Sequence, residues 1–177
     1  IAYHMPAGGH RDQPAFDVIA DILSRGRTSR FYNNIEQKGI AHSITASSEF
    51  GRYPKLFSIW ATPQDPYTTD DVEKILYEEL EKLKTEPVSD RELERVRNQL
   101  AADFIRGMRS NLGMAWRLAH YEAIAGDWQY INTLKENRSA VTKEDIIRVA
   151  EKYFTPENRT VVVMTKPEKL AETVDAD

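Results

Sequence analysis

The chain has 177 residues, enough for one ordinary domain with a sizeable hydrophobic core but not for a second full domain. Its 24 Lys and Arg and 28 Asp and Glu are interspersed and sum to a formal charge of −4, so we expect no nucleic acid and no anionic membrane surface as a partner. Apolar runs are only a few residues long, so no membrane span is expected, and the absence of cysteine excludes disulfides and thiol catalysis.

A strand and a helix are the first elements expected. Residues 1–5 alternate apolar and polar-tipped side chains and precede a turn rich in Pro and Gly. Because the chain starts within this strand and without Met, we expect a piece of a longer protein. A helix begins near Pro14, and its apolar positions recur at spacings of three and four until Gly26 ends it. These positions are Phe16, Ile19, Ile22 and Leu23.

A second, short helix and a hairpin follow without a linker. Ser29 is placed to cap the helix, and Gly39 can take the left-handed conformation that ends it. The pattern then changes to alternation, as in a strand that ends near Phe50. A turn and a second apolar strand over 56–61 complete the hairpin. The alternation predicts one shared strand face for Ile40, His42, Ile44, Ala46 and Ser48.

Several helices are expected in the second half of the chain. Helix starts with capping residues occur at Thr68, Ser89 and Thr142, each followed three residues later by an acid. Another helix runs from near Ser110 to Ala125, and a short one follows it. The arginines of the helix after Ser89 are expected on a solvated surface; they are Arg91, Arg95, Arg97 and Arg106. The helix after Ser110 runs through Leu112, Ala115, Trp116, Ala119 and Ala123.

Residues 160–165 are typical of a buried final strand. The order of elements predicts an α+β fold, with a mixed or antiparallel sheet, helices packed on one face, and a helical segment between the third and last strands. We expect one domain over 1–166 and a tail over 167–177.

The residue chemistry by itself indicates no catalytic set. A helical zinc hydrolase needs two histidines at a spacing of four, but His120 is followed by Ile124. His4 and His10 are separated by a flexible Gly-Gly loop. No serine lies in a Gly-x-Ser-x-Gly turn. We therefore expect no metal site and no catalytic nucleophile in this chain.

Four stretches, in order, resemble the pitrilysin/insulinase superfamily of zinc peptidases. Residues 26–32, Gly-Arg-Thr-Ser-Arg-Phe-Tyr, are similar to a Gly-x-x-Ser-Arg-Leu-Tyr run of the family, and 38–43, Lys-Gly-Ile-Ala-His-Ser, to its Gly-Leu-Ala-Tyr-Ser run. Residues 88–95 resemble a family helix start, and 141–160 resemble its closing helix and strand. The resemblance is to the second of the family's paired domains and covers nearly all of the chain up to Met164.

The resemblance implies a peptidase in two homologous halves that enclose a chamber, with zinc held by an inverted His-x-x-Glu-His motif on the first half. This chain lacks that motif. It is therefore expected to be the non-catalytic domain, which walls the chamber and helps bind peptide or unfolded polypeptide. Its expected partners are a homologous zinc-binding peptidase domain, which would carry the zinc, and the peptide substrate.

Active members of the family commonly place an Arg and, seven residues later, a Tyr near the scissile peptide. The corresponding positions here are Ile35 and His42. A neutral His can still donate one hydrogen bond, so His42 is the single candidate for a substrate contact. The missing Arg–Tyr pair keeps a second hypothesis open, that of an assembly or scaffold subunit of the same family without peptidase activity.

Overall fold

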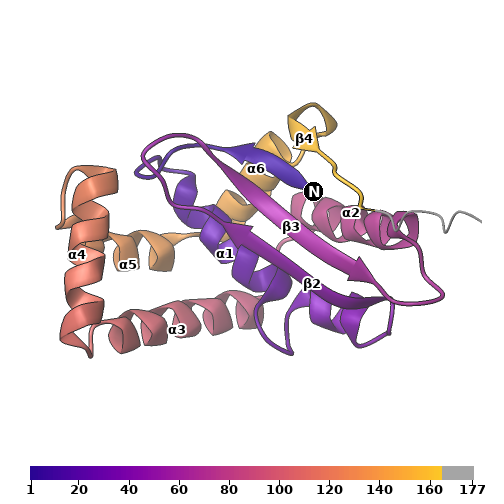
Figure 1. The fold of residues 1–177 in the computed structure, drawn as a ribbon, viewed down its shortest axis with the longest axis horizontal. Helices are drawn as coiled ribbons and strands as arrows, with labels where there is room; N and C mark the ends of the chain where they lie inside the picture. The colour runs from indigo at the N-terminus through magenta and orange to yellow at the C-terminus, as the bar shows by residue number, and fades with distance from the viewer. Residues whose placement is uncertain (165–177) are drawn as a thin grey trace, which may run out of the picture.

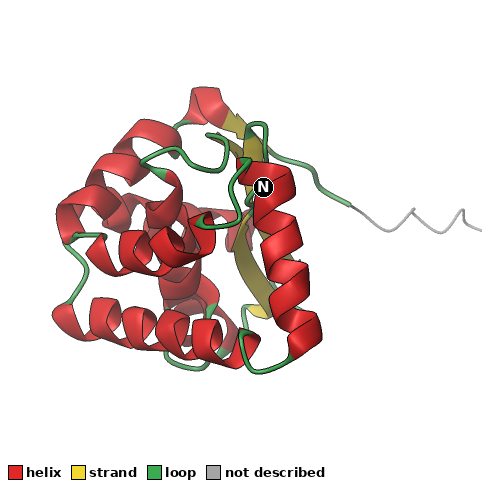
Figure 2. Ribbon diagram, turned by 90° about the vertical axis from the view of Figure 1, so that its left-hand side faces the viewer, coloured by secondary structure: helices red, strands yellow, loops and turns green. Residues whose placement is uncertain are grey.

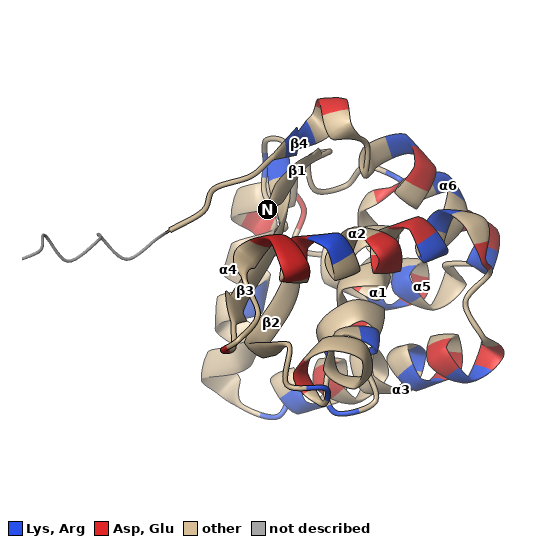
Figure 3. Cartoon of the chain, turned by 90° about the vertical axis from the view of Figure 1, so that its right-hand side faces the viewer, with Lys and Arg blue, Asp and Glu red and all other residues tan. Residues whose placement is uncertain are grey.

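Four antiparallel strands form one sheet in the order β2-β3-β1-β4 in the computed structural model, which describes residues 1–164. Helices lie behind this sheet in Figure 1, and the side view of Figure 3 shows the sheet as an outer layer of the molecule. The expected α+β class is confirmed, and the sheet is antiparallel throughout. The strands are β1 Ala2–Met5, β2 Ala41–Ser48, β3 Lys55–Pro63 and β4 Arg159–Thr160.

The expected helical segment lies between β3 and β4. It contains α2 Thr69–Thr85, α3 Asp90–Gly107, α4 Asn111–Ala125, α5 Tyr130–Ala140, α6 Lys143–Tyr153 and the short 3-10 turn η2 Pro156–Asn158. Between β1 and β2 lie α1 Gln13–Ser24 and a short π-helix, η1 Tyr32–Glu36. Acidic and basic residues alternate along the outer surfaces of α2, α3 and α6 (Figure 3). No helix in the described part of the chain combines the length and the apolar character needed to cross a membrane.

Local sequence determines where three of these helices begin. Thr68, Ser89 and Thr142 each accept a hydrogen bond from the backbone N–H three residues later, and the acid at that position accepts one from the cap's own N–H. Each cap contributes about 1 kcal/mol to helix stability. These predicted helix starts are confirmed.

Helix α1 forms the centre of the hydrophobic core. It contacts β2 on one side and α3, α5 and α6 on the others. The Phe16 ring lies 5.8 Å from the Phe57 ring of β3 and 6.1 Å from the Phe154 ring that follows α6, measured between centroids. The helix stops before Gly26, whose φ of 74° favours glycine. The predicted apolar residues of this helix are all fully buried: Phe16, Ile19, Ile22 and Leu23.

Two of the four arginines of α3 that were expected on a solvated surface, Arg95 and Arg97, are instead half-buried and hydrogen-bonded. Arg95 donates a hydrogen bond to the Thr28 hydroxyl at 2.5 Å, and Arg97 donates one to the backbone oxygen of Val141 at 2.7 Å. The prediction is wrong for this pair, because their side chains join α3 to the loop after α1 and to the start of α6. Arg91 and Arg106 are exposed, as expected.

The last strand is shorter than predicted. β4 ends at Thr160, and the four residues that follow, 161–164, are exposed rather than buried. The prediction of a buried strand is therefore wrong for these four residues. The structure does not describe Thr165 or any later residue. The predicted domain boundary after residue 166 and the predicted tail over 167–177 therefore lie outside the described residues.

Helix α4 packs against α5 through a small second cluster around Tyr121, Ile131 and Leu134. The apolar stripe of α4 is not part of this cluster. A stripe at helical spacing is normally buried against a neighbour, but here every residue of the stripe is exposed: Leu112, Ala115, Trp116, Ala119 and Ala123.

Candidate functional site

Strand β2 is an edge strand and carries a β-bulge at His42. Ala41 pairs with Pro63 and Ser43 pairs with Thr62, so His42 is the extra residue between two successive pairs. The His42 side chain is exposed, whereas Ile44 is buried. The prediction that His42 shares a face with Ile44 is therefore wrong, because the bulge interrupts the alternation and turns the imidazole outward.

A row of hydroxyl groups continues from His42 along the outer face of the sheet. Ser43, Thr45 and Ser47 of β2 are exposed, and Thr45 lies opposite Trp60 of β3. The Trp60 side chain is 69% exposed. Figure 2 shows most of the helices on the opposite side of the sheet, and the labels of Figure 3 identify α1, α3, α5 and α6 among them. Hydroxyls beside an exposed indole can contact an extended polypeptide without reading its sequence. We refer to these side chains, from His42 to Ser47 together with Trp60, as the open face.

The free edge of β2 is covered at two backbone groups. The Ile44 N–H donates to the Glu36 carboxylate at 3.0 Å, and the Ser24 hydroxyl donates to the backbone oxygen of Ala46 at 3.1 Å. Pairing with another strand needs these same groups. An extended peptide therefore cannot pair with the edge of β2 through these two backbone groups unless the two side chains move away.

Two of the sequence stretches that carry the family resemblance, residues 26–32 and 88–95, contact one another in space. Arg30 of the first stretch donates to Glu92 of the third, with 2.8 Å between Nε and Oε1. Burial raises the pKa of Glu92, but hydrogen bonds from Arg30 and from Ser89 outweigh it and lower the pKa to about 2. Glu92 is thus ionised and fully engaged at neutral pH. Its role is to join α3 to the segment before η1, not to transfer protons.

A second charged cluster surrounds Asp12, whose side chain is fully buried. Its carboxylate accepts hydrogen bonds from Arg148 at 2.6 Å, from Tyr153 at 3.0 Å and from Lys152 at 3.2 Å. Burial raises the pKa of Asp12, but these three donors outweigh it and lower the pKa to about 2. Sequence reasoning missed this cluster because the partners lie about 140 residues apart along the chain.

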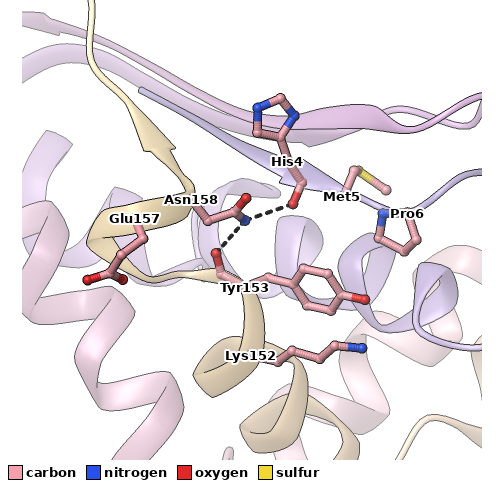
Figure 4. A pocket seen from close by; sticks show the side chains of 7 residues that line it. All are labelled: His4, Met5, Pro6, Lys152, Tyr153, Glu157 and Asn158. Atoms are coloured by element: carbon pink, nitrogen blue, oxygen red, sulfur yellow. Dashed lines mark hydrogen bonds between the residues drawn. The ribbon is translucent and has the colours of Figure 1, made fainter.

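A shallow depression lies between the end of β1 and the end of α6 (Figure 4). Two of its polar side chains, those of Asn158 and Lys152, are paired within the chain. The Asn158 amide donates to the backbone oxygens of His4 at 2.9 Å and Tyr153 at 2.8 Å, and Lys152 points to Asp12. His4 pairs with Leu56, at the opposite end of β3 from His42, so the two histidines are not brought together. The depression therefore offers no nucleophile with a base beside it.

The histidines do not assemble a metal site. His10 accepts a hydrogen bond from the Asp12 N–H at 3.1 Å through Nδ1, and His120 stacks on Trp116 with 4.7 Å between centroids. Over residues 1–164, no three His, Cys, Asp or Glu side chains gather where they could hold a metal ion. The zinc that the family resemblance implies for the homologous half therefore has no fitting ligand set among these residues.

Comparisons with known proteins agree with the architecture. Residues 1–100 match the family described as "Peptidase M16 inactive domain". Over 165 residues, covering 93% of this chain and 37% of the relative, the chain is 25% identical to zinc protease PqqE of Helicobacter pylori. The chain thus spans little more than a third of the length of this relative.

Solved structures of related proteins have the same fold as this chain. A protease from Helicobacter pylori superimposes with a TM-score of 0.83 and 25% identity, covering 89% of this chain and 38% of that one. The inactive peptidase domain of a protein assigned as a zinc protease in Bordetella parapertussis gives a TM-score of 0.78 and 25% identity, covering 90% of this chain and 86% of that one.

Proposed function

This chain belongs to the family of peptidase M16 inactive domains, and from that premise we propose that it is the non-catalytic half of a zinc metalloendopeptidase. In this role it walls a substrate chamber and helps bind peptide or unfolded polypeptide. Hydrolysis takes place at a zinc site on a homologous domain, carried either by the same polypeptide or by another chain.

The observation that carries this proposal is the open face. One side of the sheet is packed against α1, α3, α5 and α6, whereas the other side exposes Ser43, Thr45, Ser47 and Trp60 and has only α4 near one end of the sheet. A sheet face of this kind would form a chamber wall, with hydroxyls that hydrogen-bond to peptide groups and an indole that contacts apolar side chains. His42 lies at the end of this row, where its exposed imidazole would donate a hydrogen bond to a substrate oxygen.

One observation favours the alternative function, an assembly or scaffold subunit without peptidase activity. The Arg and Tyr that active family members supply are replaced by Ile35 and His42, and Ile35 is fully buried. Ile35 therefore cannot contact a substrate. In the scaffold case the chain would pair with its homologous partner, and the open face would bind no peptide.

The test is a cleavage assay with a quenched fluorescent peptide. The chain, the homologous zinc-binding half and an equimolar mixture are each assayed with and without a chelator. We expect chelator-sensitive cleavage that is much faster in the mixture than with either half alone. Chelator-sensitive cleavage by this chain alone would contradict the proposal. A stable complex of the two halves that cleaves nothing and binds no peptide would support the scaffold function.

A further inference from the structure

Strand β3 extends beyond the strand that lies beside it. β1 pairs with residues 55–58 of β3, and Ile1 continues this ladder by exchanging two hydrogen bonds, each of 2.8 Å, with Ile59. The rest of β3, residues 60–63, continues past this pair, as Figure 1 shows beyond the point marked N. Their other edge is paired with β2. Within residues 1–164, the β1 side of 60–63 therefore has no strand beside it.

The backbone groups of Ala61 point into this gap. Hydrogen-bonded pairs recur at every second residue of an antiparallel ladder, so the next residue after Ile59 to direct its N–H and C=O to the β1 side is Ala61. Among the described residues, neither of these two groups has a hydrogen-bond partner. Phe57 and Ile59, on the same face of β3, are buried, whereas Ala61 is exposed. The sheet is thus incomplete at this point, and the core beneath it is open.

The chain after β4 borders the same gap. Residues 161–164, Val-Val-Val-Met, have the β-branched composition of a strand, but they are exposed and leave the sheet after β4 (Figure 1). Continuing the registers of β1 with β3 and with β4 sets Val162 across the gap from Trp60, and Val163 across it from Ala61. One further strand segment would therefore pair with β3 on one side and with 161–163 on the other.

We propose that this gap is a slot for an extended segment that continues β1 on its N-terminal side, supplied by the residues directly before Ile1 in a longer polypeptide. The ladder selects this occupant, because the slot lies in line with β1 and the hydrogen-bonded pair of Ile1 with Ile59 fixes its direction and register. A segment joined to Ile1 enters the slot without a loop. The chain spans 37% of its Helicobacter pylori relative, so a protein of that length has further residues to supply.

The register specifies the chemistry of this segment. Tyr3 and Met5 of β1 point toward the helices and are buried. By the same alternation, the residue directly before Ile1 points outward, and the one before it points inward, next to Ala61. An inward position over a hydrophobic core takes an apolar side chain. The segment is therefore extended and apolar at the second position before Ile1.

Amide hydrogen exchange of the whole chain, followed by NMR, tests the slot. The chain is compared with a form that carries Val-Thr-Val-Thr joined before Ile1. In the extended form the N–H groups of Ala61 and Val162 should exchange at least about tenfold more slowly, because both face the slot and gain hydrogen bonds. The N–H of Val163 faces the opposite edge, so its exchange should change much less. Unchanged exchange at Ala61 and Val162 would overturn the proposal.

Two matched extensions test the register. Val-Thr-Asp-Thr places a carboxylate at the inward position and should abolish the protection of Ala61, whereas Val-Thr-Val-Asp places it at the outward position and should retain the protection. Equal protection by these two extensions would overturn the assigned register.

A separate peptide tests the source of the segment. Val-Thr-Val-Thr added in trans at millimolar concentration should protect neither Ala61 nor Val162, because it lacks the effective concentration of a segment joined to Ile1. Protection by the separate peptide would indicate a general acceptor for peptide strands and would overturn the assignment to the preceding residues. None of these readouts depends on peptidase activity, so this proposal and the proposed function can fail separately.

Discussion

The carboxylate of Glu36 accepts a hydrogen bond from the backbone N–H of Ile44, at 3.0 Å, and thereby covers the free edge of β2. In an antiparallel ladder, alternate residues direct their N–H and C=O groups away from the neighbouring strand. Ile44 and Ala46 are the outward residues here, and the second of them accepts a hydrogen bond from Ser24. The edge of β2 is thus protected against pairing with other strands by side chains from η1 and α1.

Replacing Glu36 by Ala should destabilise the chain. The variant leaves the Ile44 N–H without its charged acceptor, which costs about 1–2 kcal/mol of unfolding free energy. Amide hydrogen exchange at Ile44 should accelerate correspondingly. Both quantities can be measured by urea unfolding and by exchange followed with NMR.

The matched control is Glu36→Gln, which keeps a carbonyl oxygen at the same place without the charge. It should lose less than half as much stability as Glu36→Ala. Unchanged exchange at Ile44 in Glu36→Ala would mean that water replaces the carboxylate without loss and that Glu36 does not protect the edge.

The features predicted correctly from sequence are those that depend on neighbouring residues. The caps at Thr68, Ser89 and Thr142 each involve an acid three residues away, and the apolar spacing of α1 follows from the helix repeat. The bulge at His42 was missed because a bulge depends on the register with β3, which no local pattern specifies. The Asp12 cluster was missed for the same kind of reason, since its partners come from α6.

The open face was only partly predictable. His42 was identified through the family resemblance, and the alternation of β2 could have indicated that Ser43, Thr45 and Ser47 face outward. The exposure of Trp60 was harder to predict, because residues 56–61 are apolar at most positions and their pattern does not show which face of the strand is exposed. Its exposure depends on which face the helices cover, and that is decided by the packing of α1 on β2 and β3.

The buried Asp12 predicts acid sensitivity. Its pKa falls from 3.8 to about 2 on folding, so the folded state favours the ionised form. The corresponding stability is present above pH 3.8 and is lost as the pH falls toward 2. It amounts to about 2 kcal/mol, from 1.36 kcal/mol per pKa unit. Asp12→Asn should lose about this amount at neutral pH and should show a smaller decrease of stability in acid, as measured by urea unfolding at a series of pH values.

A suitable comparison is Glu94→Gln, which neutralises an exposed acid on α3. This variant should keep the wild-type stability within about 0.5 kcal/mol and the wild-type dependence on pH. An Asp12→Asn variant as stable as the wild type at pH 7 would contradict the assignment of Asp12 as an ion-paired carboxylate that stabilises the fold.

Trp60 should contribute to peptide binding if the open face is a chamber wall. Because its side chain is 69% exposed, Trp60→Ala should change the unfolding free energy by less than about 0.5 kcal/mol. It should weaken the binding of an unfolded polypeptide to the assembled halves about tenfold, since an exposed indole at a contact contributes about 1–2 kcal/mol. Fluorescence anisotropy of a labelled peptide measures this affinity. Trp128→Ala, another exposed indole but away from the sheet, should bind as the wild type does; equal losses in the two variants would rule out a specific role for Trp60.

His42 provides the most direct test of contact with the substrate. A single hydrogen bond to a substrate oxygen contributes about 1 kcal/mol, so His42→Ala should lower kcat/KM of the assembled halves about fivefold. His42→Tyr retains a donor and should recover part of this loss, whereas His42→Phe, of similar size but without a donor, should not. His4→Ala removes the other exposed histidine of the sheet, at the far end of β3, and should leave the rate unchanged. If His42→Phe cleaves as fast as the wild type, the imidazole donates nothing to the reaction, and the bulge serves only to end the pairing of β2 with β3.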